Sequence, residues 1–355
     1  MASKPIQALI EQLQIHQSLP QEYVQPQKIQ IQAATGGAQI PVLDLSEFTS
    51  SAAAGGKEEF LRELDQACRE WGAFQVINHG VPKDILQGMR NAAKHFYDVP
   101  VEDKMKYFVT VFDGRPMRYS TSFDSSRDVI LEWKDVLRIP AEASALEADS
   151  VWPAKEHLPR DAVNSYGGRI NDFVSVLLEA MTESLELPAG YLNEELAGRE
   201  RILAINFYPP CPDPNRAIGL GAHSDATALT VIVQNQVDGL QLFHKDHQWV
   251  TVKMLPEALL VNLGDQLQII SNGRYHSVEH RAVVNKEKLR ISVATLIGPA
   301  KSSSIAPAPQ LVDKTHPALY KPVVFKDYLF NYIKLGLNTR GALQTIATAK
   351  TEAQN

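Results

Sequence analysis

The sequence predicts a mainly β fold with helical cover, built around an antiparallel sandwich or barrel. From about residue 201, short runs of β-branched and aromatic residues alternate with Gly, Pro, Asn and Asp, as in ILAINFY, ALTVIVQ, GLQLF, ALLVNLG, LQIIS and RISVATLI. Many short strands at this spacing are typical of sandwiches and barrels. Earlier segments instead repeat apolar residues at helical spacing. A chain of 355 residues exceeds what one core usually organises, so we expect two intimate subdomains or one large sheet with helical cover.

The N-terminal region, residues 1–160, is expected to mix helices and strands. Phe60, Leu64 and Trp71 follow helical spacing, and a second amphipathic helix stops before Pro100. In chain order we expect a helix near 4–14, a strand in IPVLDLSEF (40–48), a helix over 57–72, a strand and turn in AFQVINHGVP (73–82) and a helix over 83–99.

Three further regions complete the expected organisation. Residues 161–198 link the two halves through the longest helix candidate, 166–187. Residues 199–300 form the β-rich core, and residues 301–355 carry a terminal helix at roughly 325–335 and a tail. The buried stripe of the long helix is expected to consist of Ile170, Phe173, Val174, Leu177, Met181 and Leu185.

Composition excludes several classes of protein. The net charge of −6 argues against a general role on nucleic acid or on membrane surfaces, and no run of 18 apolar residues is present. The start of the chain lacks the layout of a secretory signal. Cys68 and Cys211 are too few for a disulfide framework. We therefore expect a cytoplasmic monomer without nucleic-acid or membrane partners.

The stretch RYHSVEHRAV contains a histidine pair that resembles a zinc motif. His276-Ser-Val-Glu279-His280 matches H-x-x-E-H, which some zinc proteases use on a helix. The surrounding valines and the preceding SNG turn favour a strand instead. On a strand, residues four apart lie about 13 Å from each other at ~3.3 Å per residue, so the pair could not hold one ion. A zinc hydrolase remains the alternative, and it requires His276 as a ligand.

A second metal-binding pattern involves His223 and Asp225. Their i, i+2 spacing at a strand or its end turns both side chains to one face. One carboxylate with two imidazoles is the facial triad of non-haem Fe(II) oxygenases, so a histidine of the later pair could complete it. Arg290 and Ser292 share a face of another strand, where a cation and a hydroxyl suit a carboxylate.

The combined motifs resemble the plant Fe(II)/2-oxoglutarate-dependent dioxygenases. The matching pieces are IPVLDLS, REWGAFQVINHGVP, LEWKDVL, NFYPPCPDP, HSD, NGRYHSVEHRAVVN and RIS, and they span roughly residues 40–335. The resemblance implies a double-stranded β-helix, or jelly-roll, core at 199–300, with an N-terminal dioxygenase region and a C-terminal helix around it. It also implies that Fe(II), 2-oxoglutarate and O2 are used, with ascorbate in support. The implied iron ligands are His223, Asp225 and His280, and the implied 2-oxoglutarate contacts are Arg290, Ser292, Tyr208 and Asn206.

The substrate is expected to be a small aromatic plant metabolite, either a phenylpropanoid or a flavonoid. Tyr119, in RYSTSF, resembles a substrate-facing tyrosine of flavonoid-oxidising members, and Phe123 and Trp133 could wall the pocket. Core packing is the alternative for Tyr119 and Trp133. Leu296 is the fourth candidate contact. No catalytic residue beyond the iron ligands is predicted.

Three positions depart from the flavonoid-oxidising members of the family. Ala204, Leu296 and Gly298 stand where those members carry Lys, Phe and Glu. RYSTSF, LEWKDVL and ALYKPVVFKDYL are closer to members that ortho-hydroxylate hydroxycinnamoyl thioesters, whereas YHSVEHRAVVN resembles alkaloid-modifying members. Hydroxylation, desaturation and alkaloid O-demethylation therefore remain open. A non-catalytic jelly-roll protein that binds a small molecule is the alternative from another class.

Overall fold

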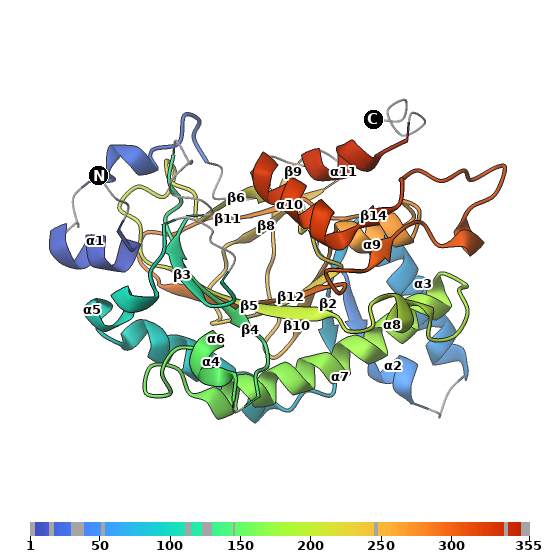
Figure 1. The fold of residues 1–355 in the computed structure, drawn as a ribbon, viewed down its shortest axis with the longest axis horizontal. Coiled ribbons are helices and arrows are strands. Elements are labelled where there is room, and N and C mark those ends of the chain that lie inside the picture. The colour runs from blue at the N-terminus through green and yellow to red at the C-terminus, as the bar shows by residue number, and fades with distance from the viewer. Residues whose placement is uncertain are drawn as a thin grey trace.

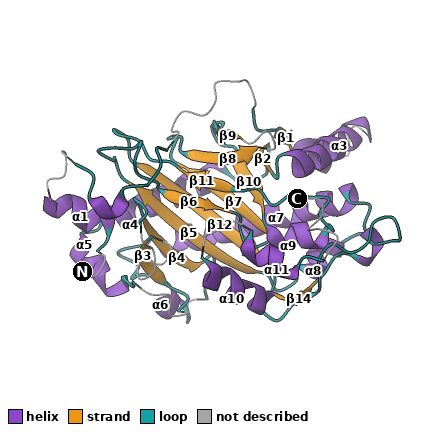
Figure 2. Cartoon of the chain, turned by 90° about the horizontal axis from the view of Figure 1, so that it is seen from above, coloured by secondary structure: helices purple, strands orange, loops and turns teal. Residues whose placement is uncertain are grey.

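Two mainly antiparallel sheets face each other and helices cover the outside (Figures 1 and 2). The computed structural model describes residues 4–13, 18–29, 39–50, 54–110, 115–122, 130–144, 146–244, 248–336 and 340–348. The strands are β1 (Val42–Asp44), β2 (Ala73–Ile77), β3 (Arg118–Thr121), β4 (Asp135–Pro140), β5 (Glu200–Tyr208), β6 (Leu220–His223), β7 (Leu229–Gln234), β8 (Leu240–His244), β9 (Gln248–Thr251), β10 (Leu259–Leu263), β11 (His280–Ala282), β12 (Arg290–Gly298), β13 (Ser304–Ile305) and β14 (Val323–Val324).

The larger sheet combines strands from the whole chain in the order β1-β2-β10-β7-β12-β5-β4-β3, and the smaller sheet has the order β6-β11-β8-β9. β1 and β2 extend one edge of the larger sheet, and β3 and β4 extend the opposite edge. The N-terminal region therefore builds part of the wall that faces the smaller sheet. This arrangement confirms the predicted β-rich core with helical cover, and its two facing sheets have the layout of a jelly roll.

The helices are α1 (Ile6–Leu13), α2 (Ser46–Thr49), α3 (Ala54–Glu70), α4 (Lys83–Asp98), α5 (Val101–Lys104), α6 (Ala148–Val151), α7 (Arg160–Ser184), α8 (Tyr191–Glu195), α9 (Asp265–Ile270), α10 (Phe325–Leu335) and α11 (Gly341–Ile346), with 3-10 turns at Gln21–Tyr23, Met105–Tyr107 and Pro309–Leu311. Every residue of the predicted stripe of the long helix is buried. In the part of the chain that the structure describes, no helix combines the length and hydropathy needed to cross a membrane.

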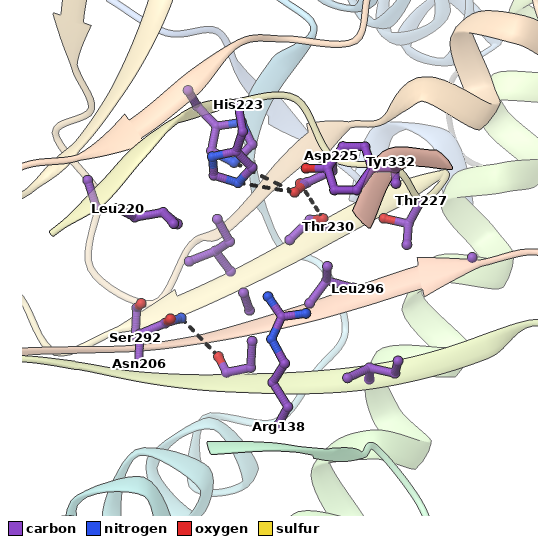
Figure 3. A pocket seen from close by; sticks show the side chains of 18 of the residues that line it. Arg138, Asn206, Leu220, His223, Asp225, Thr227, Thr230, Ser292, Leu296 and Tyr332 are labelled. Atoms are coloured by element: carbon purple, nitrogen blue, oxygen red, sulfur yellow. Dashed lines mark hydrogen bonds and ion pairs between the residues drawn. The ribbon is translucent and has the colours of Figure 1, made fainter. Parts of the chain in front are cut away.

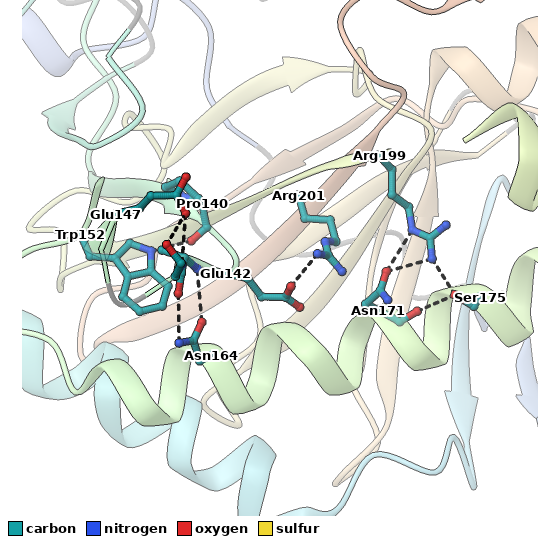
Figure 4. Close-up of polar contacts among 11 residues, drawn as sticks. Pro140, Glu142, Glu147, Trp152, Asn164, Asn171, Ser175, Arg199 and Arg201 are labelled. Atoms are coloured by element: carbon teal, nitrogen blue, oxygen red, sulfur yellow. Dashed lines mark hydrogen bonds and ion pairs between the residues drawn. The ribbon is translucent and has the colours of Figure 1, made fainter. Parts of the chain in front are cut away.

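Polar side chains tie α7 to the chain that enters β5 (Figure 4). The Arg199 guanidinium donates to Asn171 Oδ1 at 2.9 Å and to Ser175 Oγ at 2.6 Å. Arg201, on β5, donates to Glu142 at 2.7 Å. The Arg199 contacts hold the long helix against the outer side of the sheet whose inner side faces the smaller sheet, and the Arg201 contact ties β5 to the loop after β4.

Several predicted elements differ from the structure. LQIIS, predicted as a strand, lies largely in α9, where all six residues are buried. A fully buried run has no polar face, so its periodicity does not separate helix from strand.

The predicted strand over 271–284 is confined to β11, because Asn272 and Gly273 adopt positive φ in a turn and the segment up to Glu279 is a loop. The strand predicted at 40–48 is limited to β1, since α2 begins at Ser46, whose N–H donates to Asp44 Oδ1. The helix α11 was not predicted, and residues 349–355 of the predicted tail lie outside the described part.

Candidate active site

The candidate metal ligands meet where β6 and β11 pair. His223 is the last residue of β6, His280 is the first residue of β11, and the two are direct partners in the ladder. Asp225 follows two residues after His223 and turns towards both rings (Figure 3). The Asp225 Oδ1 atom lies 3.6 Å from His223 Nε2 and 3.8 Å from His280 Nε2. Among the described residues, this buried trio is the group whose ligand atoms all lie within 4.8 Å of one another.

Hydrogen bonds orient each of the three side chains towards their shared centre. The Nδ1 atoms of His223 and His280 lie 2.8 Å from the Gly221 carbonyl and 3.1 Å from the Val278 carbonyl. A proton donated there leaves each Nε2 lone pair facing Asp225. The Thr230 hydroxyl donates to Asp225 Oδ2 at 2.6 Å, so Oδ1 remains towards the rings. Two nitrogens and one oxygen on one side of a buried site fit the donor set of a divalent iron.

Electrostatics hold His223 and Asp225 in the protonation states that a metal requires. Burial, together with the neighbouring His280, lowers the pKa of His223 to about 3. Burial alone would raise the pKa of Asp225, but the two imidazoles and the Thr230 hydroxyl outweigh it and lower that pKa below its ordinary value. At neutral pH the site therefore offers a carboxylate and a neutral His223 imidazole, and both are forms that bind cations.

His276 does not join this cluster. Its segment is a loop, so the helix that the zinc motif requires is absent from residues 271–279. The Arg340 guanidinium, just before α11, lies 2.9 Å from His276 Nε2 and donates to the Ser277 carbonyl at 2.6 Å. This histidine therefore helps to anchor the C-terminal helix.

Acid is expected to destabilise the protein through His276. Burial and the adjacent Arg340 charge lower the pKa of His276 to about 4, whereas an unfolded chain has ~6.5. Between these values the unfolded chain binds more protons, so stability present above pH 6.5 is lost as the pH falls towards 4. For a partly exposed ring this amounts to about 2 kcal/mol. In urea unfolding of the metal-free proteins, the free energy of unfolding of His276→Gln should fall by about 2 kcal/mol less than that of the wild type between pH 6.5 and pH 4. An equal fall in both proteins would contradict this account.

The candidate anchor for 2-oxoglutarate lies on two paired strands of the larger sheet. Arg290 of β12 pairs with Tyr208 of β5, and Ser292 pairs with Asn206, so all four side chains share one face. All four are buried. The Arg290 guanidinium lies 5.0 Å from the centre of the Tyr208 ring. A buried cation flanked by hydroxyls fits the distal carboxylate of a dicarboxylic acid.

Sequence reasoning missed the residue that orients Arg290. The Gln234 side-chain oxygen accepts hydrogen bonds from Arg290 Nε at 3.1 Å and Nη2 at 2.8 Å. Gln234 ends β7, four residues after Thr230, on the same face of that strand. Thr230 and Gln234 thus support the metal site and the anchor from one strand. The alternation within ALTVIVQ could have pointed to this shared face.

A glycine keeps the anchor in place, and enlarging it is expected to weaken 2-oxoglutarate binding. A Cβ atom on Gly239 would lie 2.8 Å from Arg290 Cδ and 2.9 Å from the Val283 carbonyl oxygen. Gly239→Ala must therefore shift Arg290. Since a 1 Å error in positioning costs about 10²-fold, we expect roughly ten-fold weaker 2-oxoglutarate for a shift of a few tenths of an ångström. Titration of 2-oxoglutarate measures it, with Gly88→Ala on α4, where the nearest atom is 4.0 Å away, as the matched control.

The metal ligands and the candidate 2-oxoglutarate anchor open into one cavity of about 190 Å³ between the two sheets. Leu296, which the sequence analysis names as a candidate substrate contact, lines it together with Ala204 and Gly298. Tyr119 does not. It is fully buried and donates to Asp135 Oδ2 at 3.0 Å, while the neighbouring Arg118 lines the cavity. Successive strand residues point to opposite faces, so the substrate-facing prediction selected the wrong face of β3.

Trp133 also lies in the core rather than on the cavity wall. Its ring contacts Tyr23 edge-on at 5.1 Å and its Nε1–H donates to the Pro210 carbonyl at 3.3 Å. This position agrees with core packing, the alternative for this residue. Phe123 lies outside the described residues.

The helix α10 closes one side of the cavity. It contributes Phe325, Leu329, Tyr332 and Ile333 to the lining. The Tyr332 hydroxyl donates to the Ser224 carbonyl at 2.7 Å, between the two ligands His223 and Asp225 in sequence. A Cβ atom on Gly298 would lie 2.9 Å from the Phe325 ring, so this glycine makes room for α10.

The chain resembles known oxygenases along most of its length. Residues 199–299 match the 2OG-Fe(II) oxygenase superfamily, and residues 40–155 match the N-terminal region described as non-haem dioxygenase in morphine synthesis. Jasmonate-induced oxygenase 4 of Arabidopsis thaliana is 36% identical over 88% of each chain. Flavanone 3-dioxygenase 2 of Oryza sativa subsp. japonica is 33% identical over 94% of this chain and 96% of its own.

A solved structure agrees with the sequence relatives. The crystal structure of JOX2 in complex with 2OG, Fe and JA is 28% identical, covers 98% of both chains and superposes with a TM-score of 0.84. The jelly-roll core and the use of Fe(II) and 2-oxoglutarate, both expected from the sequence, are confirmed. The chain belongs to the 2OG-Fe(II) oxygenase superfamily and is a dioxygenase.

Proposed function

We propose that His223, Asp225 and His280 hold Fe(II), and that Arg290, Ser292, Tyr208 and Asn206 hold 2-oxoglutarate beside it. The convergence of two imidazole nitrogens and one carboxylate oxygen within 4.8 Å carries this proposal. The anchor supports it, because Arg290 and the metal ligands line the same cavity.

Held by these residues, Fe(II) and 2-oxoglutarate would supply the activation of O2, with succinate and CO2 as co-products. The protein's residues position and shield this chemistry. Arg290, held by Gln234, fixes the distal carboxylate of the co-substrate at one end of the cavity. Thr230 keeps Asp225 Oδ1 towards the metal position. The aromatic rings of Phe325 and Tyr332 on α10 cover the cavity and limit the access of water.

The proposed substrate is a small aromatic metabolite, either a phenylpropanoid or a flavonoid, which is hydroxylated or desaturated. The apolar lining by Ile232, Leu240, Leu296 and Phe325 supports a ring-shaped ligand. The relationship to flavanone 3-dioxygenase 2 supports this substrate class. O-demethylation of an alkaloid is the alternative outcome for the same site.

Anaerobic spectroscopy tests the proposed site. Addition of Fe(II) and 2-oxoglutarate should produce a metal-to-ligand charge-transfer band in the wild type. On exposure to air, uncoupled conversion of 2-oxoglutarate to succinate should follow, which a non-catalytic binding protein would not show. Absence of both signals would remove the proposed function. Product masses from a panel of hydroxycinnamoyl thioesters, flavanones and methoxylated alkaloids then identify the reaction.

We further propose that the enzyme acts in the cytoplasm as a monomer, without nucleic-acid or membrane partners. Cys68 and Cys211 are both free and buried, which fits a reducing compartment.

A further inference from the structure

Arg138 lies in the middle of the cavity wall formed by the larger sheet. It pairs with Ala204 of β5, which in turn pairs with Ala294 of β12. Directly paired residues of antiparallel strands project from the same face, and all three line the cavity. The guanidinium rises from β4 towards His223 and Asp225 (Figure 3). The small alanine side chains leave its path across the sheet open.

No protein group pairs with Arg138 in the described part of the chain. Its Nε atom is buried without a hydrogen-bond partner, and no hydrogen bond or ion pair joins this side chain to another described residue. Burial lowers the pKa of Arg138, although Tyr332 and Asp225 oppose that effect. Arg138 is half-buried where it lines the cavity, and an unpaired charge that is partly withdrawn from bulk water is costly. The missing partner of this cation is therefore expected to be a ligand.

Neighbouring charges in the cavity already have partners. The Lys134 ammonium lies 3.2 Å from the Glu132 carboxylate. Glu200, at the opposite end, lies 3.3 Å from Lys301. Arg118, an arginine of the same wall, also interacts with another group of the protein. None of these acidic groups is left to neutralise Arg138.

The iron and the co-substrate would not neutralise Arg138 either. Under the proposed function, the two charges of Fe(II) and the charge of Arg290 balance Asp225 and the two carboxylates of 2-oxoglutarate. Arg290 and Tyr208 also lie four residues along their strands from Ala294 and Ala204, the pair beside Arg138. This separation is about 13 Å at ~3.3 Å per residue. One positive charge beside the substrate space remains unbalanced.

We propose that Arg138 binds a carboxylate of the substrate, so that the enzyme oxidises a free organic acid rather than a neutral ring compound or a thioester. The inference rests on the proposed function and narrows its substrate class to aromatic acids, which keeps the phenylpropanoid option and excludes the flavonoid one. The guanidinium can form two parallel hydrogen bonds with a carboxylate. The acid group would lie between the co-substrate and the apolar row of Ile202 and Leu296, which line the same cavity. Its apolar body would extend towards α10.

Anaerobic calorimetry with Fe(II)- and 2-oxoglutarate-loaded enzyme tests the assignment without turnover. The probes are benzoate, phenylacetate and cinnamate, each compared with its methyl ester. We expect the wild type to bind at least one acid ten-fold or more tightly than its ester. In Arg138→Met the affinity for that acid should fall about 10- to 150-fold, the range for a lost charge-assisted hydrogen bond, while ester affinity stays within about two-fold. Arg138→Lys should retain part of the preference.

Two control variants separate charge recognition from general damage. Leu296→Ala should weaken each acid and its ester by the same factor, because it removes only apolar contact. Arg169→Met, on the exposed side of α7, should change neither. The proposal is overturned if no acid binds more tightly than its ester, or if the preference survives in Arg138→Met. It is equally overturned if Arg138→Met weakens 2-oxoglutarate itself before any acid is added. Failure of the charge-transfer band in the wild type would instead remove the proposed function.

Discussion

Replacing His280 by alanine is expected to abolish Fe(II) binding, whereas replacing His276 by alanine is expected to leave it intact. The His280 Nε2 atom faces Asp225 at 3.8 Å, but the His276 ring lies against Arg340. Loss of a group that merely orients a metal ligand already costs about 10- to 100-fold in affinity, so loss of the ligand itself should exceed ~100-fold. Anaerobic titration of Fe(II) into each metal-free variant measures this difference.

The two histidines provide a matched pair within one motif. Both are largely buried, so each variant needs a thermal unfolding curve to show that it is folded. His276→Ala should unfold more easily, because Arg340 and α11 lose a contact, while its iron stoichiometry remains that of the wild type. Loss of one metal equivalent in His276→Ala would revive the zinc-hydrolase alternative and contradict the present assignment.

Arg290→Lys is expected to weaken 2-oxoglutarate while leaving Fe(II) affinity almost unchanged. Lysine keeps the charge but loses the planar fork, which Gln234 holds at 2.8 Å in the wild type. Loss of one charge-assisted hydrogen bond costs about 1.5–3 kcal/mol, which corresponds to a roughly ten- to 150-fold weaker co-substrate. The half-saturation concentration of 2-oxoglutarate for succinate formation measures the effect.

Arg281→Lys is the matched control for this substitution. Arg281 follows His280 on β11, so its side chain points away from the cavity, where its guanidinium lies 4.1 Å from the centre of the Trp249 ring. Its replacement should alter stability slightly and leave the 2-oxoglutarate requirement as it is. An unchanged requirement in Arg290→Lys would remove Arg290 from the proposed co-substrate site.

The predictions that rested on short-range periodicity agree with the structure. Arg290 and Ser292 are two residues apart on one strand, as are Asn206 and Tyr208, and each pair lies on one face because the strand period is two. The stripe of α7 follows from its 3.6-residue period in the same way. Predictions failed where this signal was weak. The buried run LQIIS has no polar side to reveal a helix, and RYSTSF left open which face of β3 lines the cavity.

The sequence by itself determined the residue types and local spacings that this chemistry requires, and it determined the family to which they belong. Only the tertiary structure decided which residues from distant segments share a wall. The pairing of β4 with β5 sets Arg138 beside Ala204, β7 brings Gln234 to Arg290, and α10 closes the cavity against Gly298. The physical reason is that local propensity acts over a few residues, whereas ladder register and helix docking depend on burial summed over the whole chain. A lone arginine in DVLRIP reads as an ordinary strand residue until the fold shows that no described group neutralises it.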